Sequence, residues 1–196
     1  NGKFTTSCTT KVKEGMRVEI NTPELIDTRK AIIEMLFAEG NHFCPSCEKS
    51  GNCDLQNLAY DMGITFSRFP HVFSNKHVDF NPKRMIMEAN RCILCRRCVE
   101  EIQTTDGMDI FSFVNRGVKT RVHIDYEQEE KLSEAEALHA MNLCPVGAIL
   151  VKGMIYKQPF GDRKYDILGK TKQTSPGDLC ALTYEDEKFI VATTSL

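Results

Sequence analysis

The sequence predicts an α+β protein in which a small helical unit is followed by a unit with the element order βαββαβ. Helix signals flank a first group of cysteines between residues 42 and 53. Residues 63–82 then carry aromatic side chains, Pro and Asn without a clear period, which is typical of a connector. After this connector, short apolar runs alternate with helical patterns as far as residue 151. We therefore expect one domain over residues 21–80 and another over residues 81–160.

Two helices are expected in the first domain. Thr22, Pro23 and Glu24 supply an N-cap, a first-turn proline and a first-turn acid. The helix ends at Gly40, and a second helix from about Asp54 to Met62 ends at Gly63. The apolar residues at helical spacing in the first helix are Leu25, Ile32, Ile33, Leu36 and Phe37. The first cysteine group therefore lies between two helices.

The second domain has its own succession of strands and helices. Ser133 and Glu136 form a capping-box pattern that opens a helix ending before Cys144. The other expected elements are a strand at 85–88, a helical turn reaching Gln103, strands at 110–114 and 120–124, and a last strand at 148–151. Residues 161–196 form a charged tail without a core pattern before 188–191, and we expect it to contact a partner.

Bulk composition excludes several classes of function. The chain has 196 residues and a net charge of −2, from 25 basic and 27 acidic residues, so no basic field favours nucleic acid. Its apolar runs are too short for a membrane span, and residues 1–10 lack the pattern of a signal peptide. Most of the nine cysteines stand in C-x2-C runs or before Pro, which indicates metal binding in a reducing compartment. We expect a cytoplasmic protein.

The second cysteine group indicates an iron–sulfur cluster. Cys92, Cys95 and Cys98 form a C-x2-C-x2-C run, which surrounds three corners of a cubane because each thiolate binds a different iron. In ferredoxins with two clusters the run continues x3-C-P, and that fourth cysteine binds the other cluster. In this chain the position of that fourth cysteine is 102, and it is occupied by Ile.

The counterpart run would end at Cys144-Pro145, and its first three cysteines are absent. Those positions hold Glu134, Ala137 and Ala140, so all ligands of one ferredoxin-type cluster are missing. The other set, Cys92, Cys95, Cys98 and Cys144, is complete. We infer a bacterial-ferredoxin-like domain that keeps a single 4Fe-4S cluster. A structural zinc on the same thiolates is the alternative.

The first cysteine group is more ambiguous by itself. His42, Cys44, Cys47 and Cys53 could hold zinc or a cluster or form a nucleophile and its base, whereas a disulfide would leave one thiol over. Given a cluster downstream, we interpret the group as ligands of a second 4Fe-4S cubane. A neutral imidazole in place of one thiolate makes such a cluster less negative and raises its potential.

Several segments together resemble a known family. AEGNHFCPSCEKSGNCDLQ, NRCILCRRC, CPVGAI and GDRKY are similar to the small diaphorase (gamma) subunit of soluble NAD-reducing nickel-iron hydrogenases. That family is related to the N-terminal iron–sulfur region of the large peripheral subunit of respiratory complex I. The resemblance covers about residues 5–170. In relatives of the complex I type three residues separate the histidine from the first cysteine, whereas only Phe43 does so here.

The resemblance implies a non-catalytic electron-relay subunit in a hetero-oligomeric oxidoreductase. Its partners would be a flavin-bearing, NAD-binding diaphorase subunit and the small and large subunits of a nickel-iron hydrogenase. FMN and NAD would lie only on a partner. The same relay module could instead serve an NADH:quinone oxidoreductase or an NAD-dependent formate dehydrogenase, and a zinc-stabilised interaction module is the alternative outside redox chemistry.

The two remaining cysteines have less defined roles. The family begins with a plant-type ferredoxin domain that holds a 2Fe-2S cluster, and Cys8 resembles the last of its ligands. Residues 1–20 are then a remnant of that domain, and its other ligands, with the 2Fe-2S cluster, would either belong to an upstream segment or have been lost. For Cys180 we expect a free thiol at a partner contact.

Overall fold

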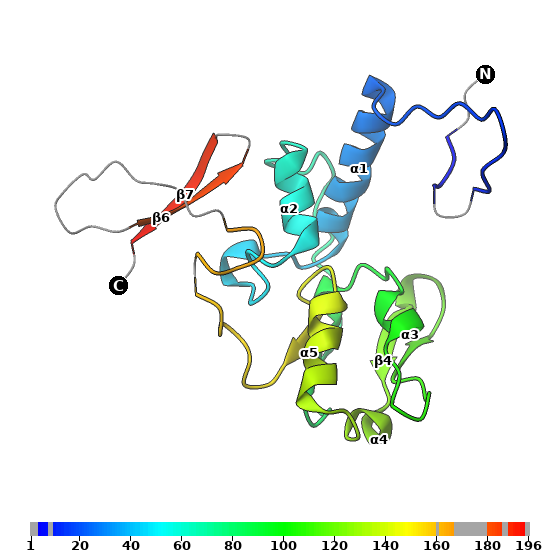
Figure 1. The fold of residues 1–196 in the computed structure, drawn as a ribbon, viewed down its shortest axis with the longest axis vertical. Coiled ribbons are helices and arrows are strands. Elements are labelled where there is room, and N and C mark those ends of the chain that lie inside the picture. Colours follow the sequence, from blue (N-terminus) through cyan, green and yellow to red (C-terminus); the bar gives the residue numbers. More distant parts are fainter. Residues whose placement is uncertain (1–3, 8–9, 160, 167–179, 186–187, 195–196) are drawn as a thin grey trace.

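The structure, a computed structural model, describes residues 4–7, 10–159 and 161–166, and the backbone alone of 180–185 and 188–194. Figure 1 shows the helices α1 and α2 above a second group of helices and strands. The part of the chain described contains no helix that is long and apolar enough to cross a bilayer.

Both helices of the first domain form where the sequence predicts them. Helix α1 (Pro23–Glu39) begins at the N-cap Thr22, whose Oγ1 accepts a hydrogen bond from the Leu25 amide at 3.3 Å. It ends at Gly40, whose amide donates to the Leu36 carbonyl at 3.1 Å. Helix α2 (Asp54–Asp61) follows the short 3-10 turn η1 (Cys44–Ser46), so the first cysteine group joins α1 to α2.

The predicted βαββαβ order of the second domain is also confirmed. Strand β2 pairs antiparallel with β5, with Met85 opposite Val151, and β3 pairs antiparallel with β4, with Phe111 opposite Ile124. The elements are β2 (Met85–Glu88), α3 (Arg97–Glu101), β3 (Phe111–Val114), β4 (Arg121–Ile124), α5 (Glu134–Leu143) and β5 (Ile149–Val151). Helix α5 opens with the predicted capping box of Ser133 and Glu136.

The structure adds elements that the sequence did not predict. Strand β1 (Val78–Asp79) extends the β2–β5 sheet, and α4 (Tyr126–Glu129) precedes α5. Short 3-10 turns lie at η2 (Ala89–Arg91) and η3 (Gly117–Lys119). Strand β7 (Lys188–Thr194) contains the apolar run of the tail and pairs antiparallel with β6 (Cys180–Glu185).

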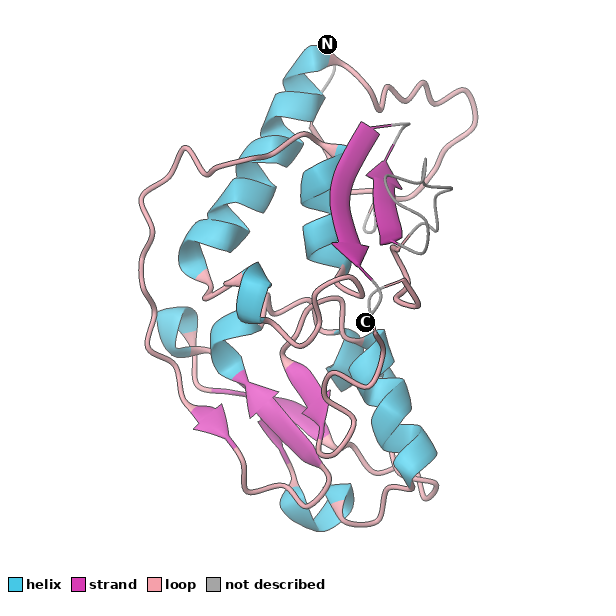
Figure 2. Cartoon of the chain, turned by 90° about the vertical axis from the view of Figure 1, so that its left-hand side faces the viewer, coloured by secondary structure: helices cyan, strands magenta, loops and turns pink. Residues whose placement is uncertain are grey.

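The connector between the two domains follows α1 before it reaches β1 (Figure 2). The Val72 amide donates to the Ala38 carbonyl at 2.8 Å, and the Ser74 hydroxyl donates to the Glu39 carbonyl at 2.9 Å. Arg68 Nε contacts the buried carboxylate of Glu34 at 2.7 Å. The connector is thus attached to the first helix along its course.

One hydrophobic core fills the second domain. Phe111, Met85 and Ile124 are each at most 1% exposed. Ile102, Ala137 and Ala140, which stand at three of the absent ligand positions, are at most 3% exposed and belong to the same core. These three positions therefore supply apolar packing where a ferredoxin with two clusters carries ligands.

Candidate metal centres

The four cysteines of the second site come together at a single cavity. Met87, Ile93, Val146 and Ile149 contribute apolar walls to it. Cys98 and Cys144 are buried, whereas Cys95 is exposed. The predicted ligands that line this cavity are Cys92, Cys95, Cys98 and Cys144.

The loop that carries Cys92, Cys95 and Cys98 contains two uncommon backbone conformations. Leu94 and Arg96 have positive φ angles of 53° and 70°. Side chains other than glycine adopt this region rarely, and such conformations persist where the surrounding structure imposes them, often at functional sites. The C-x2-C-x2-C loop is therefore held in a strained conformation in which its three cysteines line the cavity.

The predicted ligands of the first site also line one cavity. His42 follows α1, Cys44 begins the turn η1, Cys47 ends it, and Cys53 is the N-cap of α2. The Sγ atom of Cys53 accepts a hydrogen bond from the Gln56 amide at 3.4 Å. The cavity is lined by His42, Cys44, Cys47 and Cys53 together with Phe37, Ser50, Leu55, Gln56 and Gly147.

The imidazole of His42 has the properties of a metal ligand. Its Nε2 atom is buried and, among the described residues, has no hydrogen-bond partner. Burial, assisted by the charge of Arg91, lowers the pKa of His42 from 6.5 to about 4, so the ring is neutral at pH 7. Gly40 lies against it, because a Cβ at that position would be 2.4 Å from Nε2. A neutral imidazole with an unpaired nitrogen, on a cavity that three thiols also line, fits a cluster ligand.

Burial keeps five of the seven cysteine thiols of the two sites protonated until a cation binds. It raises the pKa of Cys53 and Cys92 to about 11 and that of Cys98 to about 12. The pKa values of Cys44 and Cys144 are also raised, mainly by burial. Because only thiolates bind metals, occupation of either site must release protons, and the positive charge of bound iron makes that release favourable.

The spacing of these side chains differs from that of a single-ion site. In the described part of the chain, no three His, Cys, Asp or Glu side chains are close enough together to hold one metal ion. A cubane has a different requirement, because its ligands bind separate irons at separate corners. Thiols that line a common cavity are compatible with that requirement.

A short backbone link connects the two sites. The Pro145 carbonyl accepts hydrogen bonds from the amides of Asp54, at 2.9 Å, and Leu55, at 3.4 Å. Pro145 follows Cys144, and Asp54 follows Cys53, so ligands of the two sites are joined through one hydrogen-bonded pair. Gly147 reaches the first cavity, where a Cβ would lie 2.9 Å from Cys47 Sγ. The segment 144–147 thus contributes to both sites.

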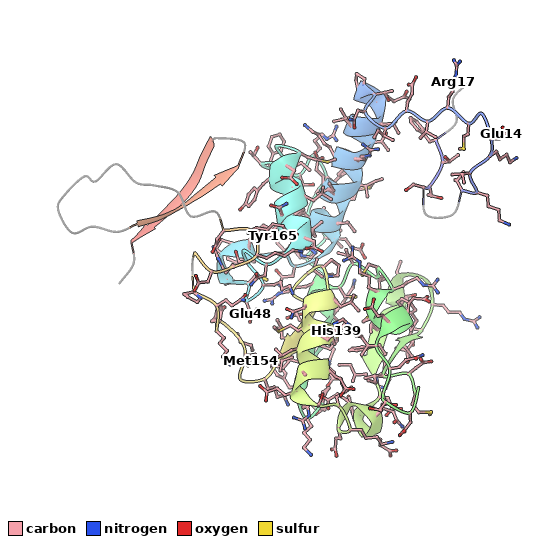
Figure 3. The ribbon with its side chains drawn as sticks, viewed as in Figure 1. Glu14, Arg17, Glu48, His139, Met154 and Tyr165 are labelled. Carbon is pink, nitrogen blue, oxygen red and sulfur yellow. The ribbon has the colours of Figure 1, made fainter. Side chains whose placement is uncertain are left out.

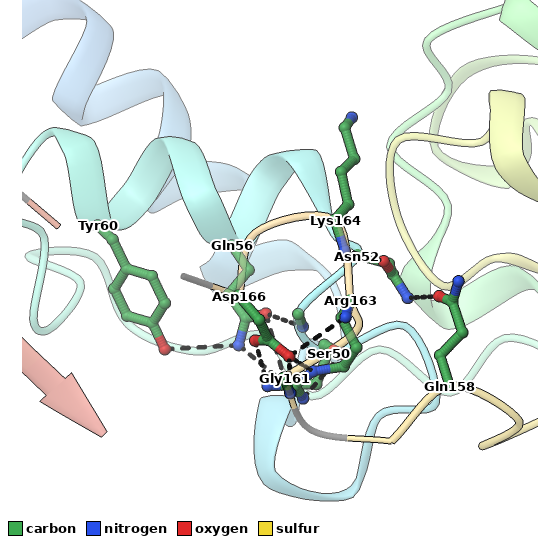
Figure 4. Close-up of polar contacts among 10 residues, drawn as sticks. Ser50, Asn52, Gln56, Tyr60, Gln158, Gly161, Arg163, Lys164 and Asp166 are labelled. Atoms are coloured by element: carbon green, nitrogen blue, oxygen red, sulfur yellow. Dashed lines mark hydrogen bonds and ion pairs between the residues drawn. The ribbon is translucent and has the colours of Figure 1, made fainter. Parts of the chain in front are cut away.

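Part of the tail fastens the loop that carries Cys53 (Figure 4). Arg163 forms an ion pair with Asp166 at 2.7 Å and donates to the Ser50 carbonyl at 3.2 Å. The Tyr165 amide donates to the Gly51 carbonyl at 3.0 Å. Gly51 has a φ of +80°, and a Cβ there would be 2.3 Å from Arg163, so a side chain would disturb this contact.

Asp54 adds a second attachment for the tail. Its Oδ1 atom accepts hydrogen bonds from Lys164 Nζ, at 2.7 Å, and from the Tyr165 hydroxyl, at 2.6 Å. Figure 3 shows Tyr165 and Glu48 at the level between the two domains. The segment GDRKY stood out in the sequence only by its family resemblance, and its contact with this loop was not predicted.

Three other predictions are not tested by the structure. The contact of the tail with a partner stays a prediction. Cys8 lies outside the described residues, and only the backbone of Cys180 is described.

Two segments of the chain match known protein families. Residues 29–68 match the family described as NADH-ubiquinone oxidoreductase-G iron-sulfur binding region. Residues 83–150 match the family described as NADH-quinone oxidoreductase subunit 3, ferredoxin-like domain. The first match contains the first site, and the second match contains the second site.

Individual proteins are also similar. The gamma subunit of the NAD-reducing hydrogenase HoxS of Cupriavidus necator is 46% identical, over 85% of this chain and 72% of its own length. The G 2 subunit of the NADH-quinone oxidoreductase of Rhizobium meliloti is 34% identical, over 90% of this chain and 20% of that protein. A chain in the crystal structure of an NAD+-reducing [NiFe]-hydrogenase in the H2-reduced state matches with a TM-score of 0.73 and 36% identity, covering 83% of this chain and 70% of that chain.

Proposed function

Because the chain belongs to the family of gamma subunits of NAD-reducing hydrogenases, we propose that it relays single electrons through two 4Fe-4S clusters. The observation that carries this proposal is that each predicted set of four ligands lines a cavity of its own. The clusters would be held by His42, Cys44, Cys47 and Cys53 in the first site and by Cys92, Cys95, Cys98 and Cys144 in the second.

The relay would run between a flavin-bearing, NAD-binding diaphorase subunit and the small subunit of a nickel-iron hydrogenase, in a cytoplasmic hetero-oligomer that includes the large subunit. The chain is 46% identical to the hydrogenase gamma subunit and 34% identical to the quinone oxidoreductase subunit, which supports the hydrogenase assignment. Hydride and hydrogen chemistry would belong to the partners. Nickel in a copurified complex would support this assignment, whereas molybdenum or quinone reduction would favour the other NAD-linked complexes.

The residues of this chain would hold the clusters and limit their contact with water. Bound clusters would supply one-electron redox chemistry without the making or breaking of substrate bonds. Ile93, Val146 and Ile149 cover the second site with apolar surface, and Phe37 and Leu55 do so at the first. Solvent exposure and hydrogen bonds to sulfur tune cluster potentials, so these walls contribute to the redox properties.

The anaerobically reconstituted chain is expected to contain about eight irons and about eight sulfides, because each of the two cubanes contributes about four irons and about four sulfides. Elemental analysis and sulfide assay measure the content, and reduction should bleach the visible absorption and give paramagnetic spectra. A Cys180→Ser variant serves as a control that should keep all the iron. Chain that binds only zinc after anaerobic reconstitution would contradict the relay and support the interaction module.

Replacing His42 with Cys is expected to change the paramagnetic spectrum of one cluster and to lower its reduction potential. A thiolate adds negative charge next to the cluster, which disfavours the arrival of an electron. The control is His139→Gln, since His139 is exposed and pairs with Glu101 at 3.1 Å. An unchanged spectrum in the His42→Cys chain would argue against ligation by the imidazole.

A further inference from the structure

A buried lysine lies beside the cysteines and lacks a carboxylate partner. Lys49 is 6% exposed, and its Nζ donates to the Met141 carbonyl at 2.7 Å. No Asp or Glu among the described residues lies within ion-pair distance of it. The chain therefore buries an ammonium group whose countercharge is not an acidic side chain.

The position of Lys49 relates it to both metal sites. It follows Cys47 of the first site by two residues, and Met141 precedes Cys144 of the second site by three. Gly147, which lines the first cavity, would place a Cβ 3.1 Å from Lys49 Cβ. Burial lowers the pKa of Lys49, whereas negative charge on Cys144, Cys53 or Asp54 acts in the opposite direction.

Burial of an unpaired ammonium is costly, and the structure compensates for only part of that cost. Removing a charged group from water costs several kcal/mol unless another charge or several hydrogen bonds replace the solvent. The Met141 carbonyl belongs to the last turn of α5, where the helix dipole places partial negative charge. An anionic group nearby would supply the remaining compensation. Cubanes bound by thiolates are anionic and become more negative when they accept an electron.

We propose that Lys49 is an electrostatic tuning residue that raises the reduction potentials of the clusters in both sites. The proposal rests on the proposed function, because it assigns Lys49 a role toward those two clusters. The ammonium group stabilises each reduced cluster more than each oxidised one, since attraction grows with the negative charge of the partner. Sharing one cation also links the sites, in addition to the hydrogen bonds at Pro145.

Replacing Lys49 with Met in the full complex tests the proposal. We expect both cluster potentials to fall by about 59 mV, which is a tenfold change in a one-electron equilibrium. Paramagnetic redox titration measures the potentials, and iron content is measured on the same samples. Lys49→Arg should restore both potentials, because it keeps the charge. Lys152→Met is the matched control, since Lys152 Nζ also donates to backbone carbonyls, those of Phe80 and Pro82, and lines neither cluster cavity.

Lys49→Gln provides a second neutral variant that retains an amide donor for the Met141 carbonyl. Unchanged potentials in either neutral variant, with the iron retained, would overturn the proposal and leave Lys49 a packing role. Loss of iron in both neutral variants but not in Lys49→Arg would support the proposal, because the sites would then depend on the positive charge. Loss of iron in the Lys49→Arg variant as well would overturn the proposal. Failure of the proposed function itself would be recognised separately, by the absence of clusters in the unmodified complex.

Discussion

Replacing Cys53 with Ser is expected to remove the iron of the first site while helix α2 stays folded. Cys53 is the N-cap of α2, and its Sγ accepts a hydrogen bond from the Gln56 amide. A serine hydroxyl is a favourable N-cap, so the cap would survive the substitution. The thiolate that binds iron would be lost, and iron content should fall from about eight to about four per chain.

Comparison with Cys53→Ala separates the two roles of this side chain. Alanine removes both the ligand and the cap, so the metal-free alanine chain should be less stable than the metal-free serine chain by about 0.5–2 kcal/mol. Chemical denaturation measures this difference, and Ser46→Ala, at an exposed position of the same loop, is the control for iron content. A Cys53→Ser chain that still binds about eight irons would show that Cys53 is not a ligand.

The elements that sequence reasoning predicted correctly have short-range causes. The N-cap Thr22 and the capping box of Ser133 and Glu136 satisfy backbone amides within three residues, so the local sequence contains all the information required. The spacing of Cys92, Cys95 and Cys98 likewise indicates their common cavity, because the ligands of one loop are constrained by the length of that loop.

The features that sequence reasoning missed depend on distant contacts. The Pro145 carbonyl caps α2 from 91 residues away, since it accepts from Asp54, and Lys49 donates to Met141 across 92 residues. In the sequence, Lys49 lies in a polar loop with Glu48 and Ser50 and resembles a surface lysine. Only the tertiary arrangement reveals that it is buried. The same holds for the contact of Arg163 with the Ser50 carbonyl.

Helix α4 was missed for a related reason, because the residue that matters most in it looks like part of a charged surface. Glu129 stands in the acidic run YEQEE, yet it is fully buried. Its Oε2 accepts a hydrogen bond from the Lys83 amide at 2.8 Å. Its Oε1 accepts from the amides of Arg84, at 2.8 Å, and Met85, at 2.9 Å. The carboxylate thus anchors the start of β2, the strand that leads to the loop of Cys92.

Replacing Glu129 with Ala is therefore expected to destabilise the protein by at least about 3 kcal/mol, because each amide left without a partner in the interior costs about 1–3 kcal/mol. Denaturant unfolding of the cluster-loaded protein measures the change, and iron released from the second site should accompany it. The matched control is Glu127→Ala, an exposed residue of the same helix, which should change stability by less than about 0.5 kcal/mol. Equal unfolding midpoints for the two variants would mean that water replaces the carboxylate at these amides, so that β2 does not depend on Glu129.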